Sequence, residues 1–169
     1  MEPKVSIIMG STTDLPVMEE AAKVLNELHI PFEINALSAH RTPELVAEFA
    51  SMAYGRGVRV IIAGASGAAH LPGVVAAFTS LPIIGVPLRS AISIEGIDSL
   101  LSIAQMPPGV PVATVGIDGA RNAGILAAQI LAVGDEVMMK TMVDFKENLK
   151  KKIVQANQEL SKISYEYKV

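Results

Sequence analysis

Five short apolar runs rich in β-branched residues alternate with longer stretches of helical pattern. The apolar positions within each run are nearly continuous, which is typical of parallel strands covered by helices on both faces. The runs are Lys4–Met9, Phe32–Leu37, Val58–Ala63, Ile83–Val86 and Pro111–Gly116, and the expected helices are Asp14–His29, Pro43–Gly55, Gly73–Thr79, Glu95–Gln105 and Ala120–Leu131. Repeated strand–helix units predict an α/β fold with a doubly wound parallel sheet.

The 169-residue chain shows no change in composition that marks a second domain, so we expect one domain. Within it, residues 1–133 are predicted to form the α/β core and residues 134–163 a helical arm. From Asp135 to Ile163 apolar side chains recur every three or four residues, which predicts one long C-terminal helix. At 1.5 Å per residue this helix is about 43 Å long, more than short strands can cover. It either lies on its own domain or, as we favour, packs on a neighbouring subunit.

The composition limits the function classes. Half of the residues are hydrophobic, 18% are charged, and the mean hydropathy is +0.41, an apolar excess that favours subunit interfaces. The net charge of −3, with basic residues scattered outside the C-terminal helix, argues against nucleic-acid binding. The absence of cysteine excludes disulfides and fits a reducing cytoplasm. Val60–Leu88 carries no charge, but glycines and prolines interrupt it, so we expect buried strands there and no membrane segment or signal peptide.

Four segments follow the carboxyl ends of the first four strands, where open parallel sheets bind ligands. They read "GSTTD", "SAHRTP", "GASGAAHLPG" and "PLRSAISIEG". In the first segment, hydroxyls and free N–H groups at a helix start suit a phosphate, but the same residue types are preferred helix caps, and both interpretations stay open. A carboxylate would repel a phosphate, so Asp14 is assigned to sugar hydroxyls.

The second segment combines two side chains that local structure does not explain. Thr42 and Pro43 have the pattern of a helix cap and a first helical residue. His40 and Arg41 have no such role, and a cation at a packed strand end calls for an anion. Arginine suits phosphate binding, and histidine moves protons near neutral pH. We therefore predict a functional site at His40 and Arg41.

The third segment does not match a dinucleotide-binding fingerprint. Its small residues suit the wall of a tight pocket, and His70 either enters that pocket or caps the next helix. His29 stands where a helix ends, which indicates a structural role. The sequence has no Walker A motif and no serine-nucleophile motif, and its three isolated histidines and few clustered carboxylates predict no metal site.

Taken together, six motifs closely resemble the class I 5-(carboxyamino)imidazole ribonucleotide mutases of purine (IMP) biosynthesis, over nearly the whole chain. They are "MGSTTD", "SAHRTP", "IIAGASGAAHLPG", "GVP", "SLLSIAQMPPGVPVATV" and "NAGILAAQIL". The resemblance implies a flavodoxin-like three-layer sandwich, a cytoplasmic homo-octamer with active sites between subunits, and a small-molecule nucleotide substrate. It also implies functional coupling to the ATP-dependent 5-(carboxyamino)imidazole ribonucleotide synthase, which makes the substrate.

The resemblance also implies roles for particular residues. Ser11, Thr13 and Arg41 would hold the phosphate, and Asp14 the ribose hydroxyls. The imidazole and its carboxylate would be surrounded by Ser38, Ala39, Ala65, Ser66 and Gly67, with His70 and Leu71 in the same pocket. His40 would carry the proton while the carboxyl group leaves the exocyclic nitrogen as trapped carbon dioxide and ring carbon 4 attacks it. The resemblance implies that this reaction uses no metal, ATP or organic cofactor.

The family usually has glycine where this chain has Ser66, and we expect a backbone conformation there that serine can adopt. Two alternative functions are considered. A class II carboxylase uses free carbon dioxide, but such enzymes typically have lysine after the motif histidine, where this chain has Arg41. A flavodoxin-like carrier of FMN would also fit "GSTTD", but this chain has no tryptophan and only three tyrosines to stack on a flavin.

Overall fold

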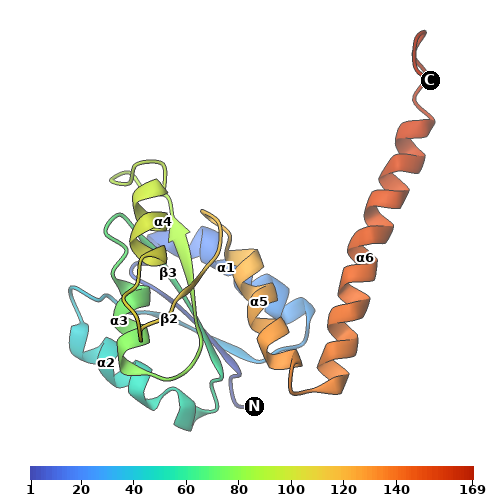
Figure 1. Cartoon of the computed structure of the whole chain (residues 1–169). Coiled ribbons are helices and arrows are strands. Elements are labelled where there is room, and N and C mark those ends of the chain that lie inside the picture. The colour runs from blue at the N-terminus through green and yellow to red at the C-terminus, as the bar shows by residue number, and fades with distance from the viewer. The chain divides into compact units, whose positions relative to one another are not determined.

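Five parallel strands form one sheet in the order β2-β1-β3-β4-β5 (Figure 1). In the computed structural model, which describes residues 1–169, Val5 pairs with both Phe32 and Val60. The strands are β1 (Val5–Met9), β2 (Phe32–Ala36), β3 (Val60–Ser66), β4 (Ile83–Leu88) and β5 (Ala113–Thr114). The chain runs outward from β1 to β2 and then crosses back to β3, so the strand order reverses between β1 and β3. This confirms the predicted doubly wound, flavodoxin-like α/β fold.

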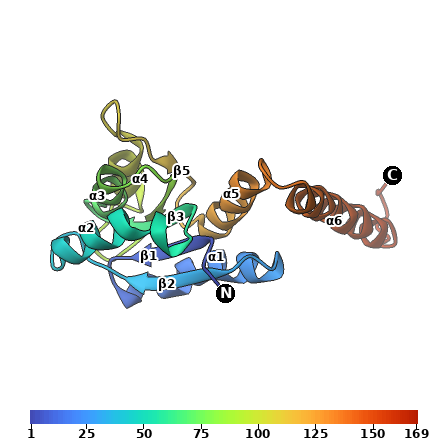
Figure 2. The same cartoon turned by 90° about the horizontal axis from the view of Figure 1, so that it is seen from below.

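Helices cover both faces of the sheet (Figure 2). They are α1 (Leu15–Glu27), α2 (Pro43–Met52), α3 (Leu71–Phe78), α4 (Ile97–Ala104) and α5 (Ala120–Ala132), with short 3-10 helices η1 (Thr12–Asp14) and η2 (Tyr54–Arg56). One core cluster joins Ile8, Ile61 and Ile83 of the sheet to buried residues of α2, α3 and α4, such as Val46, Val75 and Ile103. On the other face α5 packs on α1, where Gly124 lies against Ala21 and Val24. The result is the predicted three-layer arrangement.

The two edge strands depart from the expectation that every strand is covered on both faces. Central strands β1, β3 and β4 are almost entirely buried, but β2 is half-buried and Ile34 is 42% exposed. The expectation is therefore wrong for β2, because an edge strand has a neighbour on one side only. β5 is also shorter than predicted: it begins after Pro111, which has no N–H to give to a ladder.

The chain divides into two compact units, Met1–Leu131 and Ala132–Val169. The second unit contains α6 (Glu136–Ser161), which confirms the predicted long helix. It begins after Asp135, whose carboxylate accepts from Val137 N at 2.9 Å and from Met138 N at 3.0 Å, as a helix cap does. Large apolar side chains along α6 are exposed, among them Val143, Ile153 and Leu160. No helix of the chain is both long enough and apolar enough to cross a membrane.

Candidate active site

A cavity of about 370 Å³ lies at the carboxyl ends of β1, β2, β3 and β4, next to the point where the strand order reverses. It is lined by Gly10, Ser11, Thr13, Asp14, Ser38, Ala39, His40, Arg41, Ala65, Ser66, Ala69, His70, Leu71, Ser90 and Ile92. Every predicted site residue except Gly67 is in this lining. The four loops that bring them together are far apart in the sequence, and only the sheet order makes them neighbours.

The loop after β1 is both a helix cap and a wall of the cavity. The Ser11 hydroxyl accepts from Thr13 N at 3.3 Å and caps η1, so the capping interpretation is confirmed for this residue. Asp14 stands at the start of α1 without a side-chain capping bond. Burial raises the pKa of the Asp14 carboxyl, and a backbone hydrogen bond at Ser11 partly opposes that rise. The Asp14 carboxyl therefore lines the cavity without capping α1.

Hydrogen bonds to Ser38 shape the turn that carries His40 and Arg41. The Ser38 hydroxyl accepts from Arg41 N at 3.2 Å and from Arg41 Nε at 3.4 Å. Thr42 precedes the first residue of α2, Pro43, as predicted, but its hydroxyl bonds the Ser38 backbone instead of capping the helix. Arg41 Nη2 donates to the Gly10 carbonyl at 3.1 Å, which brings the guanidinium to the loop after β1.

His40 and His70 are hydrogen-bonded to each other. His40 Nε2 lies 2.7 Å from His70 Nδ1, and the two rings cross at 88°. His70 occupies the position before α3 but makes no side-chain capping bond there. Of the two roles left open for His70, the structure therefore favours the one in the cavity wall.

The turn before His70 has an unusual backbone. Gly67 and Ala69 both have positive φ, 62° and 50°, and Ala69 N donates to the Ser66 carbonyl at 3.1 Å. The Ser102 hydroxyl of α4 donates to the Ala68 carbonyl at 2.5 Å. Ser66 itself ends β3 and is not among the residues with positive φ, so the expected serine-compatible conformation is confirmed.

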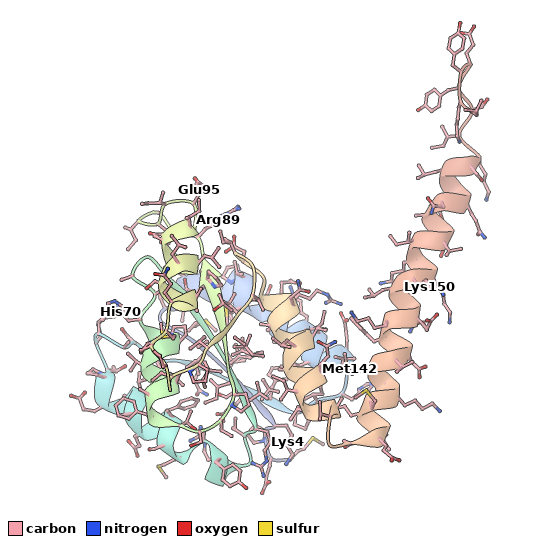
Figure 3. All side chains as sticks on the ribbon, in the orientation of Figure 1. Lys4, His70, Arg89, Glu95, Met142 and Lys150 are labelled. Carbon is pink, nitrogen blue, oxygen red and sulfur yellow. The ribbon has the colours of Figure 1, made fainter.

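Sequence reasoning missed Ser90 and Ile92, which line the cavity from the loop after β4. The Ser93 hydroxyl accepts from Ser90 N at 2.9 Å and donates to Ser90 O at 3.1 Å. The Ser90 hydroxyl is buried without a hydrogen-bond partner. The segment "PLRSAISIEG" follows a strand, and this position indicated that the loop borders the site. No pattern within the segment distinguished Ser90 and Ile92 from their neighbours as lining residues. Arg89 and Glu95 of the same loop, labelled in Figure 3, are outside the lining, and Arg89 N donates to Asp118 Oδ1 at 3.1 Å.

A larger hollow of about 770 Å³ lies elsewhere, between Ser51, Phe78 and Val110. Its lining contains no histidine, carboxylate or basic side chain, so it offers no comparable chemistry. No group of three histidine, cysteine or acidic side chains lies together in a way that suits a metal ion. The cavity at the strand ends combines a guanidinium, a carboxyl group, two imidazoles and several hydroxyls, which suits recognition of an anionic, hydroxyl-bearing molecule and proton transfer on it.

This fold and this cavity define an α/β enzyme site at the switch point of a parallel sheet. The chain belongs to the AIR carboxylase family, whose model matches residues 4–152. It is 57% identical over 149 residues to the N5-carboxyaminoimidazole ribonucleotide mutase of Pyrococcus abyssi, covering 88% of this chain and 85% of that protein. It is 53% identical over 163 residues to the mutase of Thermotoga maritima, covering 96% and 95%. The solved structure of a Treponema denticola PurE2 variant is 28% identical, with a TM-score of 0.82 over 95% of this chain and 99% of that one.

Proposed function

We propose that this protein is an isomerase that moves the carboxyl group of 5-(carboxyamino)imidazole ribonucleotide from the exocyclic nitrogen to ring carbon 4. The product is 4-carboxy-5-aminoimidazole ribonucleotide, an intermediate of purine biosynthesis. One observation carries this proposal. A chain that is 57% and 53% identical to two mutases lines a single cavity with two imidazoles, a guanidinium and a carboxyl group, those of His40, His70, Arg41 and Asp14.

The ribose 5-phosphate end of the substrate is assigned to the β1 side of the cavity. Arg41 reaches the loop after β1 through its bond to the Gly10 carbonyl, which leaves a cation beside the hydroxyls of Ser11 and Thr13. A guanidinium and hydroxyl donors suit phosphate oxygens. The carboxyl group of Asp14 makes no capping hydrogen bond to α1, so its oxygens are available to accept hydrogen bonds from the ribose hydroxyls.

The imidazole end is assigned to the β2 and β3 side. Ser38 and Ala39 form one wall, and the backbone of Ala65 and Ser66 forms the other, with Gly67 next in the chain but outside the lining. Leu71 is buried beside them. These small side chains leave room for a carboxyl group and let backbone N–H groups approach it. A closely fitting wall keeps released carbon dioxide beside carbon 4, so the second bond forms without a new encounter.

His40 carries the proton. As the carbamate C–N bond breaks, carbon dioxide leaves and the exocyclic nitrogen takes a proton from His40. Carbon 4 then attacks carbon dioxide, and the proton of carbon 4 returns to His40. One imidazole completes the cycle because one proton is given and one is taken.

The test is product formation without ATP from freshly made 5-(carboxyamino)imidazole ribonucleotide, beside aminoimidazole ribonucleotide with bicarbonate. A mutase converts the first rapidly and the second poorly at modest bicarbonate. The second candidate is a class II carboxylase that uses free carbon dioxide; the observation in its favour is that the matching family is described as AIR carboxylase. Efficient turnover of only the second substrate would establish that candidate and reject the mutase.

The homo-octamer with sites between subunits is a further part of the proposal. It is supported by large apolar side chains left exposed on the chain, including Ile92 at 84%, Ile94 at 71% and Ile153 at 65%. Burying such surface is the main driving force for association. Light scattering on the purified protein should give eight copies of the 17.8 kDa chain, and a monomer would contradict the proposal.

Coupling to the ATP-dependent synthase and a cytoplasmic location complete the proposal. The carbamate substrate is unstable, so transfer to this enzyme must outpace its breakdown. We propose that the carbamate passes from the synthase to this enzyme through solution. In that case an inactive His40→Asn variant, added in excess, should bind free carbamate and slow the coupled reaction of the two enzymes. Fractionation of cells tests the location directly.

A further inference from the structure

The hydrogen bond between His40 and His70 limits how either ring can be protonated. At 2.7 Å, His40 Nε2 and His70 Nδ1 must share one proton, with a lone pair on the other nitrogen. The state of one ring therefore sets the state of the other. His40 also keeps a single ring nitrogen, Nδ1, for the substrate.

The backbone around His70 is held in a conformation that has a cost. Ala69 lies in the left-handed region, φ 50°, which residues with a side chain seldom adopt. The Ser102 hydroxyl fixes the preceding Ala68 carbonyl from α4. His70 does not use its position to cap α3, so helix formation does not explain its side chain. The turn instead places the His70 ring against His40, where the two side chains are hydrogen-bonded.

We propose that His70 is a positioning residue, whose Nδ1 accepts a hydrogen bond from His40 Nε2–H throughout the reaction and so makes Nδ1 of His40 the atom that gives and takes the proton. This inference rests on the proposed mutase function. The acid form of His40 is an imidazolium with N–H on both nitrogens, so its partner must be an acceptor. His70 is an acceptor at Nδ1 when its own proton is on Nε2.

The protons balance without help from solvent. Before the reaction His40 carries protons on both nitrogens, and His70 carries one on Nε2. His40 Nδ1–H passes to the exocyclic nitrogen of the substrate, which leaves His40 neutral with Nε2–H still bonded to His70. When carbon 4 gives up its proton, His40 Nδ1 takes it and the imidazolium is restored. Without His70, neutral His40 is free to hold its proton on Nδ1, where it cannot act as the base.

Other charges near the pair come from two elements. Arg41 follows His40 in the same turn, and the carboxyl group of Asp14 faces the cavity from the start of α1. The walls contributed by the loops after β3 and β4 carry no charge; they are Ala65, Ser66, Ala69, Leu71, Ser90 and Ile92. An acceptor at His70 therefore favours the N–H on Nε2 of His40, and no other charged group of the lining competes for that position.

The test compares His70→Ala with His70→Asn in the full-length protein. Asparagine offers a carbonyl acceptor and alanine none. His70→Ala should lower kcat about 10- to 100-fold with KM within about threefold. His70→Asn should recover part of kcat, because its side-chain carbonyl can accept from His40 Nε2–H. His29→Asn is the control, because His29 lies outside the cavity and asparagine tolerates its φ of 57°.

A second measurement does not depend on activity. The chain has three histidines, so ¹⁵N signals of the rings can be assigned from the three variants. Neutral His40 should be the Nε2–H tautomer in the wild type and a mixture in His70→Ala. A His40 that carries its neutral proton on Nδ1, or a His70→Ala deficit in kcat that asparagine does not recover, would overturn the inference. A wild-type protein without mutase activity but with the expected tautomer would instead reject the proposed function.

Discussion

Arg41 Nη2 donates to the backbone carbonyl of Gly10 at 3.1 Å, across 31 residues of sequence. This bond joins the loop after β2 to the loop after β1, whose hydroxyls face the same cavity. A guanidinium has five N–H groups, so the bonds to the Gly10 carbonyl and the Ser38 hydroxyl leave donors for a phosphate. The same side chain therefore fixes the shape of the site and supplies its cation.

Arg41→Ala should weaken substrate binding more than catalysis. Loss of a charge-assisted contact is worth about 1.5–3 kcal/mol, so KM should rise by roughly ten- to a hundredfold while kcat changes less. Steady-state kinetics measures both values. Arg59→Ala is the matched control, because Arg59 lies outside the cavity, over the ring of Tyr54. An unchanged KM in the Arg41 variant would count against a phosphate contact there.

His40→Asn should leave the assembly intact and lower turnover by about 10²–10⁴-fold, the usual loss on removing a general acid or base. The imidazole side chain is exposed, so its replacement creates no cavity in the core. Turnover and particle mass are measured on the same sample. Near-normal turnover would show that another group moves the proton.

Asp14→Asn should stabilise the protein at neutral pH and weaken substrate binding. Burial raises the pKa of Asp14 in the folded state, so the folded protein binds its proton more tightly than the unfolded chain does. The stability from this group is present at low pH and is lost as pH rises through the raised pKa. Urea unfolding should therefore show a gain for the variant at pH 7.5 that shrinks towards pH 4. A gain of the same size at both pH values, or one matched by Asp144→Asn on exposed helix α6, would contradict this.

Ser90→Ala and Ser99→Ala should differ in stability although both remove a buried hydroxyl. The Ser90 hydroxyl has no partner, so its removal should change the free energy of unfolding by less than about 0.5 kcal/mol. The Ser99 hydroxyl donates to Leu88 O at 3.0 Å, and its loss should cost about 1–3 kcal/mol. Denaturant titration of the two variants tests this. Equal losses would mean that the Ser90 hydroxyl is bonded in solution.

Gly124→Ala should destabilise the protein, although alanine is usually better than glycine within a helix by about 1 kcal/mol. A Cβ at position 124 would lie 3.0 Å from the Ala21 carbonyl oxygen and closer still to Val24, so α1 and α5 would have to separate. We expect a loss of about 1–3 kcal/mol by thermal unfolding. Gly55→Ala, which has open space around its Cβ, should be neutral or stabilising. Stabilisation by both substitutions would show that the two helices are less tightly packed than described.

The sequence by itself determined the elements of this fold. The apolar runs placed all five strands, and the pattern of Thr42 and Pro43 placed the start of α2, because these signals depend on residues close together in the chain. The parallel arrangement then placed "GSTTD", "SAHRTP" and "GASGAAHLPG" at one edge, which is why most predicted site residues line one cavity.

Only the tertiary structure decided which side chains meet within that edge. The bond between His40 and His70 spans 30 residues and depends on strand register and on the left-handed turn at Ala69. The unpartnered hydroxyl of Ser90 and the exposure of Ile34 on β2 depend on which strands lie side by side and which lies at the edge. These properties come from distances between segments remote in the sequence, which local patterns of apolar and polar residues do not encode.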